Sequence, residues 1–296
     1  MIEPSCTPDV VTRFAPSPTG RLHIGHAWSA LIAHDFARAY EGRFLLRIED
    51  IDGTRSREEH VAGIVEDLSW LGIVWDGEPV RQSQRLPLYE AALDRLKQAG
   101  LAYPCFCTRA EVAAEIAASG SAPHGPDGPL YPGTCRQLSA SERADKLARL
   151  PHCWRLDMAS AVRQAGPMHW RLFDGTEIAA MPEQAGDVVL ARKDAPTSYH
   201  LAATLDDAAM GISHVIRGED LRAATHIHRL LQALLDLPSP AYRFHGLLVD
   251  AQGKRLAKRS GSIGLADLRA AGTDPALLVR DLRAGVFPFG ISVQPA

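Results

Sequence analysis

The chain has 296 residues, of which 46% are hydrophobic, and its formal net charge is −3. No apolar run approaches the roughly 18 to 20 residues of a membrane span, and no export signal precedes the five cysteines. We therefore expect a cytoplasmic protein with no membrane partner and no disulfide framework. Any nucleic acid would have to bind a local basic face, because the overall charge is weakly negative.

The first motif is RFAPSPTGRLHIGH, residues 13–26, which joins a predicted strand over residues 10–14 to a helix beginning near Ala27. Such a junction presents unpaired backbone N–H groups and the positive end of a helix dipole, which suit phosphate. His23 and His26 can face one spot, and Gly25 would let a nucleotide approach the backbone. A helix start with capping histidines is the equal alternative.

A second predicted strand, FLLRIED at residues 44–50, follows the first helix. The order strand, helix, strand is typical of a parallel sheet. Apolar residues then recur at helical spacing over residues 61–71 and 88–96. These patterns predict α/β structure over the first hundred residues.

Residues 101–185 interrupt this alternation with cysteines, an alanine-rich helical pattern and a glycine- and proline-rich loop, so we interpret them as an insertion. A C-x-C pair followed by Y-x-x-x-C could supply the four donors that zinc prefers. These donors are Cys105, Cys107, Tyr131 and Cys135, with His124 a weaker substitute for the unusual tyrosine ligand. Free cysteines packed in a small subdomain are the alternative. Cys6 and Cys153 lie outside the pattern and are interpreted as ordinary thiols.

The sheet is predicted to resume after the insertion, and a short helical tail ends the chain. His226 and His228 lie two apart on one predicted helix, cannot share a face, and are assigned no function. The expected elements are strands in DVVLAR (187–192), SHVIRGEDL (213–221) and RFHGLLVD (243–250), and helices over 199–209, 224–235, 265–271 and 276–283.

The stretch GKRLAKRS, residues 253–260, places four cations on a loop that Gly253 anchors. Such a loop could close over a polyphosphate and neutralise charge as it develops. In isolation, a solvated basic loop is the better interpretation. Considered together with the histidine motif at a strand-to-helix turn, the loop is better interpreted as a phosphate-binding one.

Five ordered motifs together resemble the class I glutamyl-tRNA synthetase catalytic core over roughly residues 10–260. They are RFAPSPTGRLHIGH, RIEDIDGTRS, TSYHLA, VIRGEDL and KRLAK. The resemblance implies a Rossmann-like, parallel-sheet core made of residues 1–100 and 186–260. It also implies an inserted, acceptor-type subdomain with one structural zinc over 101–185, and a short helical tail, 261–296, without an anticodon-binding domain.

The family implies that ATP, accompanied by Mg²⁺, activates L-glutamate as glutamyl-adenylate, which then passes to a hydroxyl group on RNA. Catalysis of the first step rests on positioning and charge stabilisation. His23, His26 and Lys258 match the catalytic positions, and Gly25 and Arg255, with Lys258, match the ATP site. The cationic loop departs from the family because Arg255 replaces a lysine and Ala257 replaces a serine.

The family's glutamate-binding positions also have matches in this chain. Arg13 and Arg217 would hold the side-chain carboxylate and Glu49 the amino group. Alternatives are a surface ion pair of Arg217 with Glu219, and a Glu49 that caps the next helix. The APSPTG form resembles glutamyl enzymes, so we expect glutamine to be disfavoured. The full set is Arg13, Phe14, Ala15, Pro16, Ser17, Glu49, Tyr199 and Arg217.

The expected RNA follows from a second resemblance. Full-length glutamyl-tRNA synthetases continue past the cationic loop into helical domains that read the anticodon, and we expect none here. The short glutamyl-queuosine tRNA(Asp) synthetases also lack those anticodon-reading domains, and they carry the C-x-C, Y-x-x-x-C pattern. We therefore expect a monomer that attaches glutamate to queuosine in tRNA(Asp), with Arg222, Arg229 and Arg243 as candidate RNA contacts or solvated surface arginines. Alternatives are a truncated discriminating glutamyl-tRNA synthetase and a non-catalytic RNA-binding protein.

Overall fold

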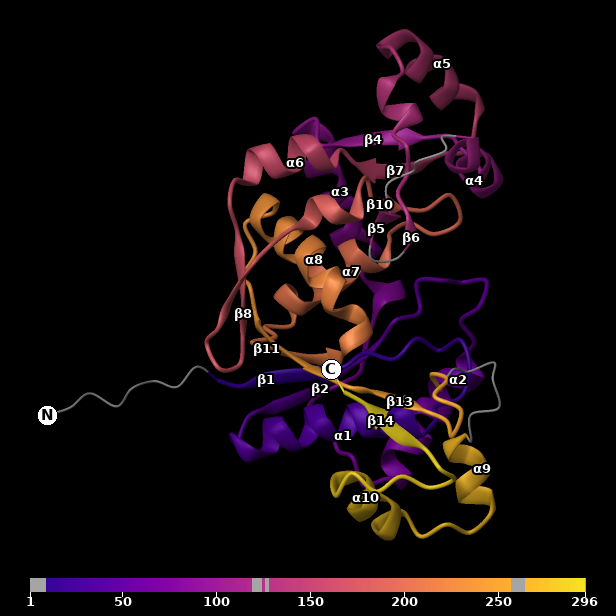
Figure 1. Ribbon diagram of the computed structural model, residues 1–296, viewed down its shortest axis with the longest axis vertical. Helices are drawn as coiled ribbons and strands as arrows, with labels where there is room; N and C mark the ends of the chain where they lie inside the picture. Colours follow the sequence, from indigo (N-terminus) through magenta and orange to yellow (C-terminus); the bar gives the residue numbers. More distant parts are fainter. Residues whose placement is uncertain (1–8, 119–123, 126–127, 257–263, 296) are drawn as a thin grey trace, which may run out of the picture.

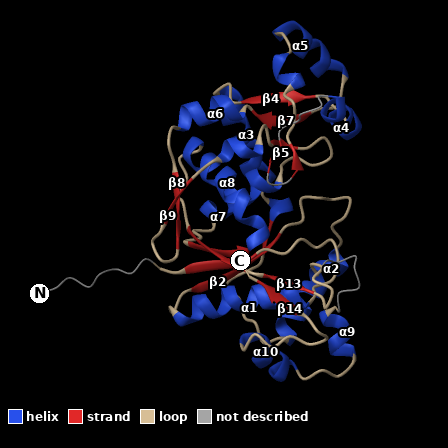
Figure 2. Ribbon diagram, in the orientation of Figure 1, coloured by secondary structure: helices blue, strands red, loops and turns tan. Residues whose placement is uncertain are grey.

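The computed structural model describes residues 9–118, 124–125, 128–256 and 264–295 (Figure 1). Helices and strands alternate through most of the chain, which confirms the predicted α/β class (Figure 2). In the described part of the chain, no helix is both long and apolar enough to cross a membrane.

The first half of the central sheet is parallel, with β1 fully buried and β2 mostly buried. Strand β1 pairs with β2, and β2 pairs with β3, in parallel register. The predicted helix is present as α1, begins at Ile24 and packs on β1 and β2 through its buried apolar side. The elements are β1 (Val11–Phe14), α1 (Ile24–Ala39), β2 (Arg43–Ile48), α2 (Glu58–Trp70), β3 (Val80–Arg81) and α3 (Leu86–Gln98).

The second half lies beside the first. The Val11 N–H donates to Ser213 Oγ at 2.8 Å, and the Ser213 N–H donates to Val11 O at 3.1 Å, which joins β1 to β11. Strand β11 is parallel to β12, and β12 is parallel to β8. The elements are α7 (Tyr199–Ala209), β11 (His214–Gly218), α8 (Arg222–Leu234) and β12 (Ala241–His245). The carboxyl ends of β1 and β11 therefore meet at one edge, where α/β proteins bind ligands.

The intervening segment carries its own antiparallel sheet, β10-β7-β4, drawn with α4 and α5 in the upper part of Figure 1. Its elements are β4 (Ala102–Cys105), α4 (Arg109–Ala118), β5 (His124–Gly125), β6 (Gly128–Pro129), α5 (Ala140–Arg149), β7 (Cys153–Leu156), α6 (Met158–Ala165), β8 (His169–Leu172), β9 (Glu177–Ala179) and β10 (Val189–Ala191). Short 3₁₀ turns connect several of them.

The expectation that DVVLAR resumes the parallel sheet was wrong. Strand β10 pairs antiparallel with β7, whereas β8, from within residues 101–185, pairs with β12 of the central sheet. A short apolar run predicts a buried strand but does not identify its partner. Strands on either side of the predicted limit at residue 186 thus pair with one another: β10 with β7, and β8 with β12. The domain limits of residues 1–100, 101–185, 186–260 and 261–296 stay predictions.

The tail packs against the first half of the sheet. It contains α9 (Leu265–Ala270), α10 (Pro275–Arg283) and β14 (Ser292–Gln294), and β14 pairs with β13 (Leu247–Val249), which precedes the tail. The single strand predicted over residues 243–250 is divided at Gly246. A Cβ there would lie 2.2 Å from the Gln294 carbonyl oxygen, so only glycine allows β14 to approach this closely.

Candidate functional site

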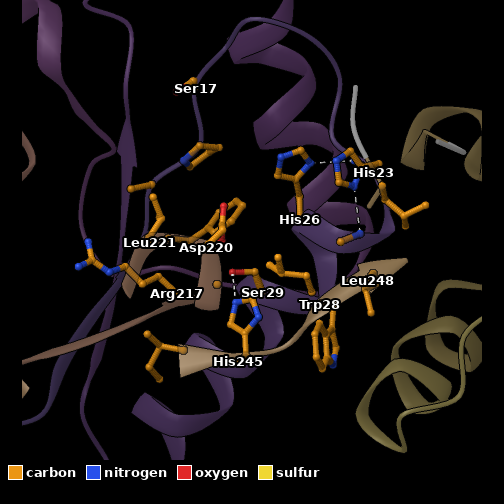
Figure 3. Close-up of a pocket in the computed structure, with 18 of the residues that line it drawn as sticks. Ser17, His23, His26, Trp28, Ser29, Arg217, Asp220, Leu221, His245 and Leu248 are labelled. Atoms are coloured by element: carbon orange, nitrogen blue, oxygen red, sulfur yellow. Dashed lines mark hydrogen bonds between the residues drawn. The ribbon is translucent and has the colours of Figure 1, made fainter. Parts of the chain in front are cut away.

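A pocket of about 480 Å³ opens where β1 and β11 end (Figure 3). The predicted site residues that line it are Arg13, Phe14, Ala15, Pro16, Ser17, His23, Gly25, His26, Glu49, Tyr199, Arg217 and Arg255. Lys258 and Ala257 lie outside the described residues. The pocket therefore brings together groups that the sequence separates by more than two hundred positions.

The histidine turn both caps α1 and lines the pocket. His23 is the N-cap residue: its Nδ1 accepts from the Gly25 N–H at 3.1 Å, and His26 Nδ1 accepts from the His23 N–H at 3.2 Å (Figure 3). The two interpretations of this turn are thus compatible. Because each Nδ1 accepts a hydrogen bond, a neutral ring carries its proton on Nε2. A Cβ at Gly25 would lie 3.0 Å from the His23 ring, so the glycine gives that ring room.

The floor of the pocket holds a buried charge network. Arg13 Nε donates to Asp207 Oδ1 at 3.0 Å, and Arg47 also pairs with Asp207. Burial alone would raise the pKa of Asp207, but the two guanidinium groups outweigh it and lower that pKa. Arg13 therefore lines the pocket with its charge already balanced by a carboxylate.

Glu49 belongs to the same network. Its side chain accepts from Arg47 Nη2 at 3.1 Å, while α2 begins nine residues later with Arg57 as its N-cap, so Glu49 does not cap that helix. Burial raises the pKa of Glu49, and the charge of Arg47 opposes this effect. A partly buried carboxylate at the pocket wall suits an ammonium partner.

Arg217 has a different environment, because its partners are neutral. It donates to Thr225 Oγ1 at 2.6 Å, to His228 Nδ1 at 3.2 Å and to Tyr199 Oη at 3.4 Å. The alternative of a surface ion pair with Glu219 was wrong: Arg217 is 4% exposed, and Glu219 pairs with Arg222. Among the described residues, no carboxylate forms an ion pair with Arg217.

Sequence reasoning missed several residues at or behind the pocket. His245 and Ser29 line it, and their side chains lie 3.0 Å apart (Figure 3). Asp220 also lines it and pairs with Arg255 at 2.6 Å. Asp207 and His228 lie behind the wall. A signal existed for Asp207, since two consecutive acids interrupt the apolar pattern of residues 199–209.

The predicted zinc donors converge at one end of β4. Tyr131 Oη lies 3.4 Å from Cys105 Sγ and 3.6 Å from Cys107 Sγ, and the Sγ atoms of Cys107 and Cys135 are 3.4 Å apart. Donors at the corners of a zinc–sulfur tetrahedron lie about 3.8 Å apart, so the four residues fit one ion. The side chain of His124 lies outside the described part of the structure.

Cys153 lies opposite Cys105 in the β4–β7 register and does not belong to the group of three thiols that could hold a metal. A hydrogen bond with Cys153 is the largest influence on Cys105 and helps to lower its pKa to about 4. A thiolate is the form that binds metal. Cys153 thus adjoins the cluster without completing it, and Cys6 lies outside the described residues.

The candidate RNA contacts are held by the protein to different degrees. Arg222 pairs with Glu219 and lies 4.3 Å from the centre of the Phe244 ring. Arg229 Nε donates to the His169 carbonyl at 2.9 Å, while Arg243 is exposed on β12. Protein groups thus hold Arg222 and Arg229, whereas Arg243 is exposed to solvent.

Comparison with known proteins gives the family. The family described as "tRNA synthetases class I (E and Q), catalytic domain" matches residues 9–292. The chain belongs to this family. It is therefore a ligase of the aminoacyl-tRNA synthetase type.

Similar proteins include both kinds of glutamyl enzyme. A glutamyl-Q tRNA(Asp) synthetase of Rhodobacter capsulatus is 51% identical over 90% of this chain and 97% of its own length. One of Symbiobacterium thermophilum is 43% identical over 91% and 84%, respectively. A glutamate–tRNA ligase 2 of Nitrosococcus oceani is 40% identical over 90% of this chain but 57% of its own length.

The fold is also that of a solved relative. The glutamate-tRNA synthetase of Elizabethkingia anophelis superimposes with a TM-score of 0.71 at 30% identity. The match covers 86% of this chain and 53% of that one, so the chain spans about half of the solved structure.

Proposed function

We propose that this synthetase-family protein activates L-glutamate with ATP as glutamyl-adenylate and transfers glutamate to queuosine in the anticodon loop of tRNA(Asp). The observation that carries the activation step is a single pocket that joins the histidine turn to Arg217, a buried arginine with neutral partners. The RNA is supported by the names of the similar proteins and by the C-x-C, Y-x-x-x-C cluster.

In the first step, the α-carboxylate of glutamate attacks the α-phosphorus of ATP and pyrophosphate leaves with its electron pair. The protein need not move a proton, because the nucleophile is already ionised. The Nε2–H groups of His23 and His26 would donate to phosphate oxygens, and Lys258 would hold the departing pyrophosphate. Bound Mg²⁺ would neutralise phosphate charge. Since Glu49 and Asp220 are paired with arginines, phosphate oxygens would be its main ligands.

Amino acid selection follows from the charges around the pocket. Glu49 would bind the ammonium group, and Arg217 the side-chain carboxylate through two parallel hydrogen bonds. Glutamine would leave the Arg217 charge without a counter-charge in a buried place, which makes it a poor substrate. The hydroxyl group of Tyr199, near Arg217, would add a neutral hydrogen bond.

The zinc site is part of the proposal. We infer that Cys105, Cys107, Tyr131 and Cys135 hold one structural Zn²⁺, because three thiol sulfurs lie within 4.8 Å of one another and the tyrosine oxygen completes the set. The ion would fix the end of β4 and the turn that contains Cys135. It lies in the β4–β7–β10 region and takes no part in the chemistry of the pocket.

The second candidate function is charging of tRNA(Glu), which the 40% identity with a glutamate–tRNA ligase 2 favours. Labelled glutamate should be supplied with ATP and tRNA from cells with and without queuosine. We expect label only on the queuosine-containing RNA, whereas labelling of tRNA(Glu) from both sources would favour the second candidate. Absence of glutamate-dependent exchange of pyrophosphate into ATP would support the non-catalytic alternative.

A further inference from the structure

His228 lies directly behind Arg217, although its sequence position gave no indication of a role. It is on helix α8 with 2% of its surface exposed, and its Nδ1 lies 3.2 Å from Arg217 Nη1. On the other side, its Nε2 lies 3.4 Å from Nδ1 of His200. The ring therefore lies between the pocket arginine and the half-buried imidazole of His200.

The hydrogen bond fixes the state of the ring. A guanidinium group can only donate, so His228 Nδ1 must accept and cannot carry a proton. The proton of the neutral ring is then on Nε2, where it can be donated to His200. Burial, followed by the nearby charge of Arg217, lowers the pKa of His228 well below its ordinary value. Geometry and electrostatics thus agree on a neutral acceptor.

A neutral partner is unusual among the buried arginines of this region. The buried Arg13 and Arg47 each pair with Asp207, and the half-buried Arg85 pairs with Asp206. Arg217 is held instead by a hydroxyl on each of Thr225 and Tyr199 and by the His228 ring. Its buried Nε has no hydrogen-bond partner among the described residues. Among the three arginines that line or underlie the pocket, Arg13, Arg47 and Arg217, the charge of Arg217 is thus not balanced by a carboxylate of the described residues.

We propose that His228 is a positioning and specificity residue, which holds the Arg217 guanidinium through a neutral acceptor so that the arginine keeps its full charge for an acidic substrate side chain. This inference rests on the proposed glutamate activation and deepens it. A carboxylate at position 228 would hold Arg217 equally well but would balance its charge, and so would remove the preference for glutamate over glutamine.

The test uses three variants of the full chain and measures pyrophosphate exchange with glutamate and with glutamine. In His228→Asn, the side-chain oxygen can take the place of Nδ1 as a neutral acceptor. His228→Asp has the same shape and adds a negative charge. His228→Leu removes the acceptor but fills the space. His226→Asn is the matched control, since His226 lies on the same helix and bonds to Trp170 and Met181.

We expect His228→Asn to keep the glutamate preference, and His228→Asp to lower the ratio of kcat/KM for glutamate to that for glutamine by at least about tenfold. His228→Leu should raise the KM for glutamate roughly 10- to 100-fold and leave the KM for ATP unchanged. Equal ratios for His228→Asn and His228→Asp would overturn the inference, as would equal losses for ATP and glutamate. A wild-type protein inactive with glutamate would instead overturn the proposed function, on which this inference depends.

Discussion

Asp207 is the residue on which the buried charges of the pocket depend most. Arg47 has no exposed surface, and Arg13 is 6% exposed, yet both guanidinium groups meet the same carboxylate. Removing one partner of a buried ion pair leaves an uncompensated charge in a poorly solvated place. The resulting loss of free energy of unfolding exceeds the net stabilisation that the intact pair provides. Asp207 does not line the pocket and therefore stabilises it from behind.

Asp207→Asn should lower the free energy of unfolding by about 3 to 5 kcal/mol, because it leaves two buried guanidinium groups with reduced compensation. Urea unfolding measures this change. Asp94→Asn is the control, since Asp94 pairs with Lys97 at the surface and should contribute less than about 1 kcal/mol. Equal unfolding midpoints for the two variants would contradict this account.

The same carboxylate predicts a dependence on pH. The pKa of Asp207 is lowered in the folded protein, so its stabilising contribution is present above the unfolded-state value of about 3.9 and is lost as the pH falls further. The difference in stability between wild type and Asp207→Asn should therefore be constant near neutral pH and shrink as the pH falls below about 3.9. A difference that grows on acidification would contradict the assigned charge.

Site residues that belong to a sequence motif were predicted correctly, whereas residues that hold them in place from behind were not predicted. Arg13, Glu49, Tyr199 and Arg217 were identified by resemblance, and all of them line the pocket. His228 was missed because the apolar spacing of a helical sequence shows which residues are buried, but not which of them contacts an arginine on a strand. Such pairings depend on the packing of α8 against β11 and β12, which no local pattern contains.

At the scale of elements, the start of α1 combines a structural and a chemical task. His23 caps the helix with its Nδ1, and the same ring lines the pocket. Asparagine is among the best N-cap residues but has no imidazole Nε2–H. The two tasks can therefore be separated by one substitution.

His23→Asn should change the free energy of unfolding by no more than about 0.5 kcal/mol, because asparagine can keep the cap. It should lower kcat for pyrophosphate exchange by about 10²-fold, as loss of a donor to developing charge does elsewhere. His23→Ala should lose the cap as well, at about 1 kcal/mol. An active His23→Asn would mean that the ring serves the helix alone.

The β4–β7 region allows a paired test of the metal. If Cys105, Cys107, Tyr131 and Cys135 hold zinc, the purified protein should contain about one zinc ion per chain, because a structural site with four protein ligands binds one ion. Cys135→Ser should lose the metal and lower the Tm, whereas Cys153→Ser should keep it, because Cys153 lies outside the thiol group. Atomic absorption distinguishes these outcomes. A metal-free wild type, or equal loss in both variants, would contradict the assignment.

Most elements followed from periodicity, and the errors arose where tertiary partners decide. Helix α7 begins and ends where its apolar spacing predicted, at Tyr199–Ala209. Strand β10 was recognised as a strand but assigned to the wrong sheet, because antiparallel pairing with β7 is a long-range property. Strand β14 was not predicted, since it is an exposed strand whose partner among the described residues is β13 alone.

At the scale of the whole molecule, the tail is tied to the core at two places. Arg283 on α10 forms two hydrogen bonds with Asp35 on α1, each 2.7 Å long, and β14 pairs with β13 beside the pocket. Apolar residues of α9 and α10 belong to the same core as those of α1 and β2. The family match over residues 9–292 agrees with this continuity.

The most direct test of the account is the position of the glutamate on the RNA. Labelled glutamate, ATP and queuosine-containing tRNA(Asp) should be incubated with the protein, and the RNA should then be cleaved into an anticodon fragment and a 3′-terminal fragment. The account predicts that the label remains with the anticodon fragment and is absent when queuosine is lacking. Label on the 3′-terminal adenosine would contradict it.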